Sequence, residues 1–233
     1  MSVWQGFIRG LELIVTFDSE VMAIAGRSVA ISLSAMCIAA VVCIPLACLI
    51  HFGRVPGKRW LIALIQTFYS VPTVLVGLLV FLSFSRTGPL GGLQLMFTPQ
   101  LMAIGQAILV SPILLGLVIS ALAGTDKRLK QTAVSLGASH VQGAVLVMRE
   151  ARYAMLTAMT MGFGRAISEV GLALMVGGNI RGFTRTLTTA ISLETAKGDV
   201  ELSIALGLIL LLIALFVNVA MNRLQQVRIE TSG

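Results

Sequence analysis

Long uncharged apolar runs, separated by short polar segments, divide the chain. A helix that crosses the roughly 30 Å hydrocarbon core of a bilayer needs about 20 apolar residues. Five runs reach that length, and only the fourth contains charged residues. They predict spans at 28–50, 60–85, 100–123, 153–176 and 202–221. The pattern therefore predicts an all-α integral membrane protein with about five transmembrane helices.

The first 20 residues follow a different pattern. Their large apolar side chains recur at helical spacing, with polar side chains elsewhere around the helix; they are Trp4, Phe7, Ile8, Leu11 and Val15. This arrangement predicts that the segment 1–20 forms an amphipathic helix lying in the membrane interface. A short sixth span is the alternative.

Composition supports lipid as the solvent. The chain is 57% hydrophobic and 12% charged, with a mean hydropathy of +0.95, whereas soluble domains carry about a quarter charged residues. We therefore expect one membrane domain over residues 1–233. The net charge of +7 does not indicate a nucleic-acid partner, because the basic residues form short groups between apolar runs and not one basic face.

The basic residues predict an orientation. Ten lie after the first span, after the third span or in the C-terminal tail, including Arg54 and Arg228, and six lie on the opposite side. Because cytoplasmic loops carry the excess of Lys and Arg, the first group is expected to be cytoplasmic. With five spans, the N-terminus is then outside and the C-terminus is in the cytoplasm.

Two predicted spans contain a proline close after a serine, as Ser70-Val71-Pro72 and as Ser111-Pro112. Proline removes a backbone hydrogen bond, which membrane helices tolerate where neighbouring groups satisfy the freed carbonyl. Two interpretations stay open: kinked helices that face a shared interior, or ordinary packing. In the first case, Ser70 and Ser111 could line a polar pathway as neutral hydrogen-bond donors.

The segment 126–152 is too polar to span the membrane, and its apolar residues are too regularly spaced for an irregular loop. Gly137 suits the left-handed residue that ends a helix, and Ser139 with Gln142 forms a capping-box pattern that starts the next one. Apolar residues recur at helical spacing on both sides, the second stripe being Val141, Ala144, Val145 and Met148. The pattern predicts two short helices joined at Gly137.

This segment resembles the EAA motif of bacterial ABC-importer permeases. The similarity lies in Gln131-Thr132-Ala133-x3-Gly137 and in Val147, ten residues after the glycine. Four positions depart from the motif, where Gln131, Thr132 and Arg149-Glu150 replace Glu, Ala and Leu-Pro. The resemblance implies that the segment couples the permease to a cytoplasmic ATPase through Ala133, Gly137, Ala138, Val147 and Glu150.

Arg165 and Glu169 are the charged residues of the fourth predicted span. Each costs roughly 2.5–3.5 kcal/mol at mid-membrane on insertion scales. Four positions apart on a helix, they can form an ion pair. Such a pair either stabilises the fold or contacts the transported ion, and the sequence leaves both readings open.

The run 162–171, the turn Gly177-Gly178-Asn179-Ile180 and the segment 184–191 are together similar to molybdate and tungstate permeases, the tungstate branch in particular. The resemblance implies a type I (MetI-like) ABC-importer transmembrane domain in a bacterial inner membrane. It also implies an oxyanion cargo, a homodimer of this subunit, two ATPase subunits and an extracytoplasmic oxyanion-binding protein. Arg181 and Arg185, in the predicted outer loop beside several threonines, are then expected to dock that protein.

Other functions find less support. The chain has no GxxxxGK[ST] phosphate loop, so it is not expected to be an enzyme or to bind a cofactor, and ATP and Mg²⁺ belong to the partner ATPase. His51 and His140 are too isolated for a metal site. One alternative is a different cargo such as sulfate. Another is an ion-coupled secondary transporter, although the sequence shows neither the internal repeats nor the broken-helix pairs typical of that class.

Overall fold

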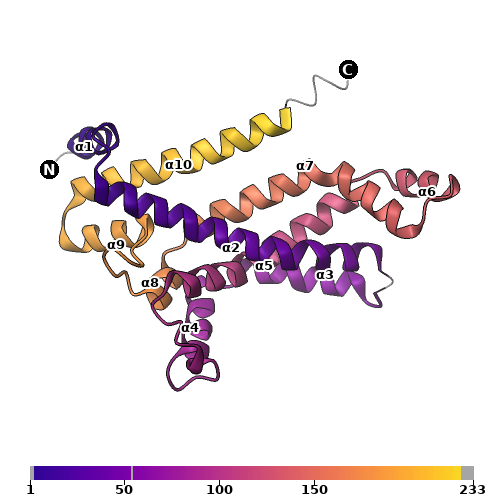
Figure 1. Ribbon diagram of the computed structural model, residues 1–233, viewed down its shortest axis with the longest axis horizontal. Helices are drawn as coiled ribbons and strands as arrows, with labels where there is room; N and C mark the ends of the chain where they lie inside the picture. The colour runs from indigo at the N-terminus through magenta and orange to yellow at the C-terminus, as the bar shows by residue number, and fades with distance from the viewer. Residues whose placement is uncertain (1–2, 54, 227–233) are drawn as a thin grey trace.

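The computed structural model describes residues 3–53 and 55–226, and every regular element in this part is helical (Figure 1). Arg54 and Arg228, which entered the orientation prediction, lie outside the described residues. In chain order the elements are α1 (Val3–Val15), α2 (Ser19–Phe52), α3 (Lys58–Thr67), η1 (Phe68–Ser70), α4 (Thr73–Phe84), η2 (Gly91–Leu93), α5 (Pro99–Ala123), α6 (Lys127–Ser135), α7 (His140–Ile167), α8 (Gly171–Gly177), α9 (Leu187–Lys197) and α10 (Val200–Gln226).

Three helices are long and apolar enough to cross a membrane unaided: α2, α5 and the part of α10 over Val200–Met221. Two further candidates are bent pairs, α3 and η1 with α4, and α7 with α8. Counting each bent pair as one span gives five. The all-helical membrane fold predicted from the sequence is confirmed, but two spans are not straight helices.

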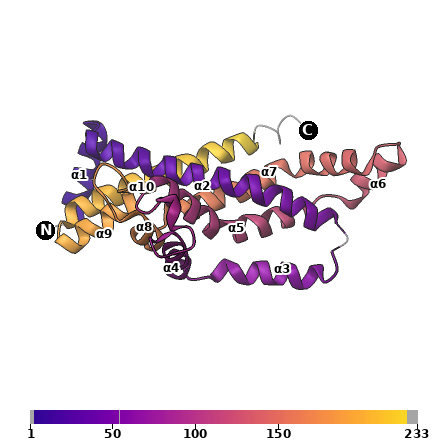
Figure 2. The ribbon, with the colours of Figure 1, turned by 60° about the horizontal axis from the view of Figure 1, so that its bottom comes forward.

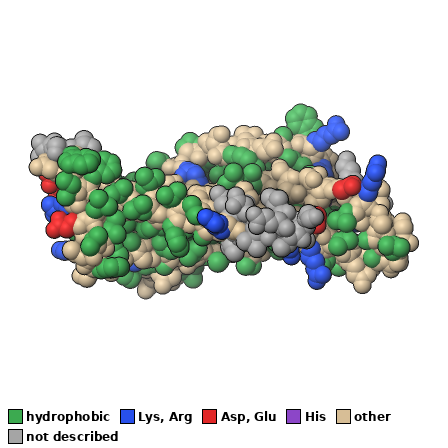
Figure 3. Space-filling model, turned by 90° about the horizontal axis from the view of Figure 1, so that it is seen from above, with side chains coloured by type: hydrophobic (Ala, Val, Ile, Leu, Met, Phe, Trp, Pro, Cys, Tyr) green, Lys and Arg blue, Asp and Glu red, His purple; other side chains and the backbone are tan. Residues whose placement is uncertain are grey.

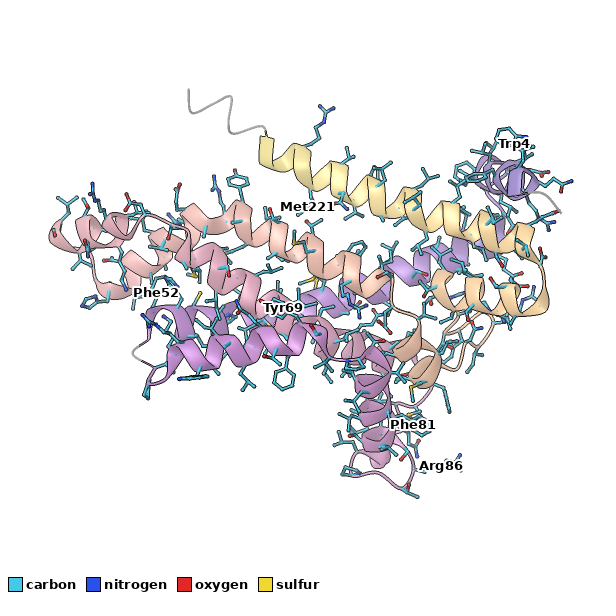
Figure 4. The ribbon with its side chains drawn as sticks, turned by 180° about the vertical axis from the view of Figure 1, so that it is seen from behind. Trp4, Phe52, Tyr69, Phe81, Arg86 and Met221 are labelled. Atoms are coloured by element: carbon cyan, nitrogen blue, oxygen red, sulfur yellow. The ribbon has the colours of Figure 1, made fainter. Side chains whose placement is uncertain are left out.

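The first break lies at Val71 and Pro72. Proline disfavours the helical conformation in the residue before it, and both residues are extended, with ψ of 129° and 126°. The chain turns by 93° between α3 and α4, so α4 leaves the bundle as an arm (Figure 1). Phe81 and Arg86 lie on this arm (Figure 4). Of the two interpretations left open for the span 60–85, the structure therefore supports the bent helix at Pro72.

The second break occurs without proline. The α7–α8 pair bends by 61° at residues 168–170, whereas α5 continues through Pro112 as one helix. Of the two interpretations left open at Pro112, the structure therefore favours ordinary packing within a continuous helix. The structure also contains the broken-helix pairs that the sequence did not reveal, so their absence no longer argues against a secondary transporter.

The core of the bundle is packed around α2 and α5, with α7 against both (Figure 2). One stripe of α2 carries small buried side chains four residues apart: Ala35, Ala39, Cys43 and Ala47. Large aliphatic side chains of α5, including Leu114 and Val118, fill the same cluster. Small residues on one helix let the partner backbone come close, which is the usual way membrane helices associate.

The helix α1 packs on α10 near the opposite end of the chain. Gly6 and Gly10 form its contact face, since a Cβ at Gly10 would lie 3.1 Å from the Cα of Ala205. The predicted apolar stripe points away, and Trp4 is 73% exposed. A lipid-facing position of this stripe stays a prediction.

Charged side chains avoid much of the surface over α2 and α10. Seen from above, apolar side chains cover a broad area, while charged ones gather at the end formed by α1 and α9 and in the half that contains α6 and α7 (Figure 3). This distribution fits a molecule whose two ends lie in water.

Gly116 tests the packing of η1 on α5. A Cβ at this position would collide with the Tyr69 ring, lying 2.7 Å from its Cζ. We expect Gly116→Ala to lower the melting temperature of the purified protein, because overpacking costs about 1–3 kcal/mol. Gly26→Ala is the matched control, since nothing lies within 4 Å of its Cβ position. Equal melting temperatures for the two variants would contradict the described packing.

Candidate functional site

The turn between α6 and α7 is closed by backbone hydrogen bonds. Gly137 has a φ of +95°, its N–H donates to the Val134 carbonyl, and the Ala138 N–H donates to the Ala133 carbonyl, both at 3.0 Å. This is the Schellman arrangement that ends helices at glycine. The predicted helix end at Gly137 is confirmed.

The next helix begins at a complete capping box. The Ser139 hydroxyl accepts the Gln142 N–H at 3.2 Å, and the Gln142 side chain accepts the Ser139 N–H at 2.7 Å. The sequence predicted this cap but placed a short helix after it. In the structure the helix runs on without interruption to Ile167, so the second helix of segment 126–152 and the fourth span are one element.

The segment packs on itself along a face that the sequence did not predict. Gly143, Val147 and Ala151 form the buried face, and a Cβ at Gly143 would lie 3.2 Å from Lys130 Cγ on α6. The stripe expected from Val141 onward is therefore not the packing face of the helix. Val141 is 73% exposed. Leu136, at the tip, is 84% exposed.

The residues predicted to couple to an ATPase occupy three environments. Gly137 and Glu150 are exposed, Ala133 and Ala138 are half-buried, and Val147 is buried in the core cluster. Val147 can therefore support the segment from inside but offers no surface to a partner. Their coupling role stays a prediction.

Arg165 and Glu169 form the expected ion pair, at 2.9 Å between Nη1 and Oε2. Arg165 lies in the last turn of α7, but Glu169 lies beyond the helix end, in the break before α8. Its second carboxylate oxygen, Oε1, accepts the Leu172 N–H at 3.0 Å, and its carbonyl accepts the Thr188 hydroxyl at 2.8 Å. Glu169 therefore joins α7, α8 and α9 at one point, which we call the polar junction.

The arm α4 meets α8 beside this junction. A Cβ at Gly77 would lie 3.0 Å from the Leu172 Cα, and one at Gly171 would lie 3.2 Å from the Val74 side chain. Glycine is needed at both places because the two backbones approach closely. The two helix breaks, distant in sequence, thus face each other in space.

The threonine-rich stretch is an internal scaffold. Thr184 is fully buried, and its hydroxyl donates to the Gly177 carbonyl at 2.6 Å and accepts the Ile180 N–H at 2.9 Å. Thr186 and Thr189 cap the start of α9. The threonine hydroxyls expected beside Arg181 and Arg185 are therefore buried inside the protein, and residues 187–197 form α9.

Arg181 and Arg185 lie at the end of the molecule opposite α6, and they differ in environment. Arg181 is exposed and pairs with Glu20 of α2, its Nε at 2.7 Å from Oε1, and this carboxylate raises the pKa of Arg181. Arg185 is half-buried, and its Nε finds no partner among the described residues. Both line a cavity of about 540 Å³ together with Arg9, Glu194 and Lys197. Their docking role stays a prediction.

The two serines predicted to line a pathway are separate from each other. Ser70 is exposed at the end of η1, at the first helix break. Ser111 is half-buried in α5, and its hydroxyl donates to the Ala107 carbonyl at 2.6 Å. Of the two, only Ser70 therefore presents a hydroxyl without a partner among the described residues, next to the arm α4.

Three polar residues with structural significance were missed from the sequence. Ser28 accepts the Leu187 N–H at 2.8 Å, and Arg27 donates to the carbonyls of Gly182 and Arg185. Gln106 of α5 is 3% exposed and its Oε1 has no partner among the described residues. A polar side chain in an apolar run was the available signal at Ser28 and Gln106.

The described residues also contain no group of three His, Cys, Asp or Glu side chains that could hold a metal ion.

Comparisons with known proteins point in one direction. Residues 43–228 match the family model described as binding-protein-dependent transport system inner membrane component. The chain is 40% identical to the tungstate uptake system permease protein TupB of Peptoclostridium acidaminophilum, over 95% of this chain and 97% of that protein. It is 43% identical to a probable anion ABC transporter permease protein of Haloferax volcanii, over 84% and 87%. Among solved structures, the MetNI methionine ABC transporter in inward-facing conformations matches with a TM-score of 0.71 at 18% identity, over 88% of this chain and 94% of that chain.

The scaffold role of Thr184 can be tested directly. Thr184→Val keeps the shape of the side chain but leaves the buried Gly177 carbonyl without this partner, at about 1–3 kcal/mol, and also removes the acceptor of the partly buried Ile180 N–H. We expect a clearly lower melting temperature. Thr87→Val, at an exposed turn, is the control and should melt like the unmodified protein. A Thr184→Val variant as stable as this control would show that the hydroxyl is dispensable.

Proposed function

The chain belongs to the family of binding-protein-dependent transport system inner membrane components, and on this premise we propose that it is the permease subunit of an ATP-driven importer for an oxyanion, tungstate first and molybdate second. The observation that carries the choice of cargo is the near full-length similarity to a tungstate uptake system permease protein. The fold of a MetI-like transmembrane domain agrees with this function. The chain is a transport component and not an enzyme by itself.

The permease works in an assembly. Membership of the family implies an ATPase and a substrate-binding protein as partners. We propose further that two copies of this chain and two ATPase subunits form the importer. The arm α4 offers a contact surface for a second copy, because it is apolar and projects from the bundle.

We propose that the end with α6 faces the cytoplasm, as the basic residues indicate. The exposed Leu136 and Val141 then meet the ATPase, while ATP and Mg²⁺ bind to that partner. Arg181, Arg185 and the cavity between them lie outside, where the binding protein docks. The N-terminus is outside and the C-terminus is in the cytoplasm.

The cargo is tested with the complete importer in proteoliposomes. We expect ATP-dependent tungstate accumulation when the chain, its ATPase and its binding protein are all present. The chain alone should neither bind tungstate at submicromolar concentration nor hydrolyse ATP, because recognition and energy come from the partners. Uptake of sulfate without tungstate or molybdate uptake would reassign the cargo, and ATP-independent uptake would overturn the class.

The turn at Gly137 provides a test of coupling. Its φ of +95° strains any residue with a Cβ, at about 1–2 kcal/mol. We expect Gly137→Ala to insert normally but to reduce tungstate uptake per ATP hydrolysed, because the turn that meets the ATPase is altered. Gly124→Ala is the control, since Gly124 lies just before the same segment at a φ of −75°. Unchanged coupling in Gly137→Ala would contradict the assignment.

A further inference from the structure

We propose that Arg165 contacts the oxyanion during its passage through the membrane layer, and that Glu169 is a positioning residue that holds the Arg165 guanidinium in place. The inference rests on the proposed function, because it concerns the path of the same cargo. It assigns different roles to two residues that the sequence could treat only as a pair.

Glu169 offers no accessible surface to a ligand. Its side chain is 2% exposed, Oε2 accepts Arg165, and Oε1 accepts the Leu172 N–H. Its backbone is also engaged, since the carbonyl accepts the Thr188 hydroxyl. Residues of α7, α8 and α9 therefore hold Glu169 in place. Glu169 can influence a ligand only indirectly, through the position of Arg165.

Arg165 is the open partner. Its side chain is 33% exposed, and of the five N–H donors of a guanidinium only one at Nη1 has an acceptor among the described residues. N–H donors without acceptors in the hydrocarbon layer would each cost several kcal/mol of free energy. The exposed side of Arg165 must therefore face water or a polar ligand and not lipid, which places a hydrated space beside the polar junction.

The surroundings favour an anion in that space. The position of a Cβ on Gly171 lies 3.5 Å from Thr73 Oγ1 and 3.6 Å from Glu169 Oε1, so the start of α4 lies next to the ion pair. This helix of 12 residues has no side-chain cap, and the N-terminus of a helix adds to a positive field. The Ser70 hydroxyl, three residues earlier, is exposed.

The charges around Arg165 favour transient binding of the anion over tight binding. Arg165 is the only Arg or Lys in the five predicted spans, and Glu169 neutralises its charge. A guanidinium offers forked donors that match an oxyanion, but the adjacent carboxylate weakens the attraction. The anion can therefore be held in transit and released, while tight recognition is left to the binding protein.

The complete importer in proteoliposomes tests this role. Arg165→Gln should slow tungstate uptake about tenfold, the loss of one hydrogen bond to a charged group. ATP hydrolysis stimulated by loaded binding protein should remain, because the coupling segment lies at the other end of α7. Arg86→Gln, an exposed arginine at the tip of the arm, is the matched control and should transport like the unmodified importer.

A double variant separates anion contact from a purely structural pair. Arg165→Gln with Glu169→Gln restores a neutral hydrogen-bonded pair and an acceptor for Leu172, so the melting temperature should recover relative to Glu169→Gln alone, which leaves an unpaired arginine. Tungstate uptake should stay low in the double variant. Recovery of uptake together with stability, or normal uptake in Arg165→Gln, would overturn the inference. An unmodified importer that takes up no oxyanion would instead overturn the proposed function, and the inference with it.

Discussion

Lipid offers no hydrogen-bond partners, so every departure from helix inside the membrane layer has to be satisfied by the protein itself. This constraint bears most heavily on the break between α7 and α8. There Glu169 accepts the Leu172 N–H and the Arg165 guanidinium, while Thr188 donates to its carbonyl. The junction determines where α8 and α9 can lie, and through Gly77 and Gly171 it also determines where the arm α4 rests.

The architecture combines stiff and interrupted elements. The helices α2 and α5 are continuous and joined by a stripe of small side chains, whereas α4 and α8 are short pieces beyond breaks. One helix connects the two regions of interest: α7 starts at the Ser139 cap and carries Arg165 in its last turn. Its 28 residues span about 42 Å. Because α7 is one continuous helix, a displacement of the turn at Gly137 is transmitted to the polar junction.

Much of this fold could be read from the sequence, for physical reasons that also explain the failures. Spans follow from hydropathy, and the turn at Gly137 and the Ser139 cap follow from local backbone chemistry. The break after Ile167 carried no proline signal, because its stability comes from Glu169 and Thr188, which lie 19 residues apart. The packing face of α7 was misassigned because glycine adds nothing to an apolar pattern, yet Gly143 permits the closest approach to α6. The helix α9 was missed because threonine disfavours helices in isolation, whereas here burial of Leu187 and Ala190 compensates.

The contact of α1 with α10 carries a consequence for biosynthesis. Gly6 and Gly10 receive side chains from Ile204, Ala205 and Leu208, so α1 binds a helix that is synthesised long after it. Until α10 emerges, α1 lacks its main packing partner. A nascent chain that stops before α10 would leave this glycine face uncovered.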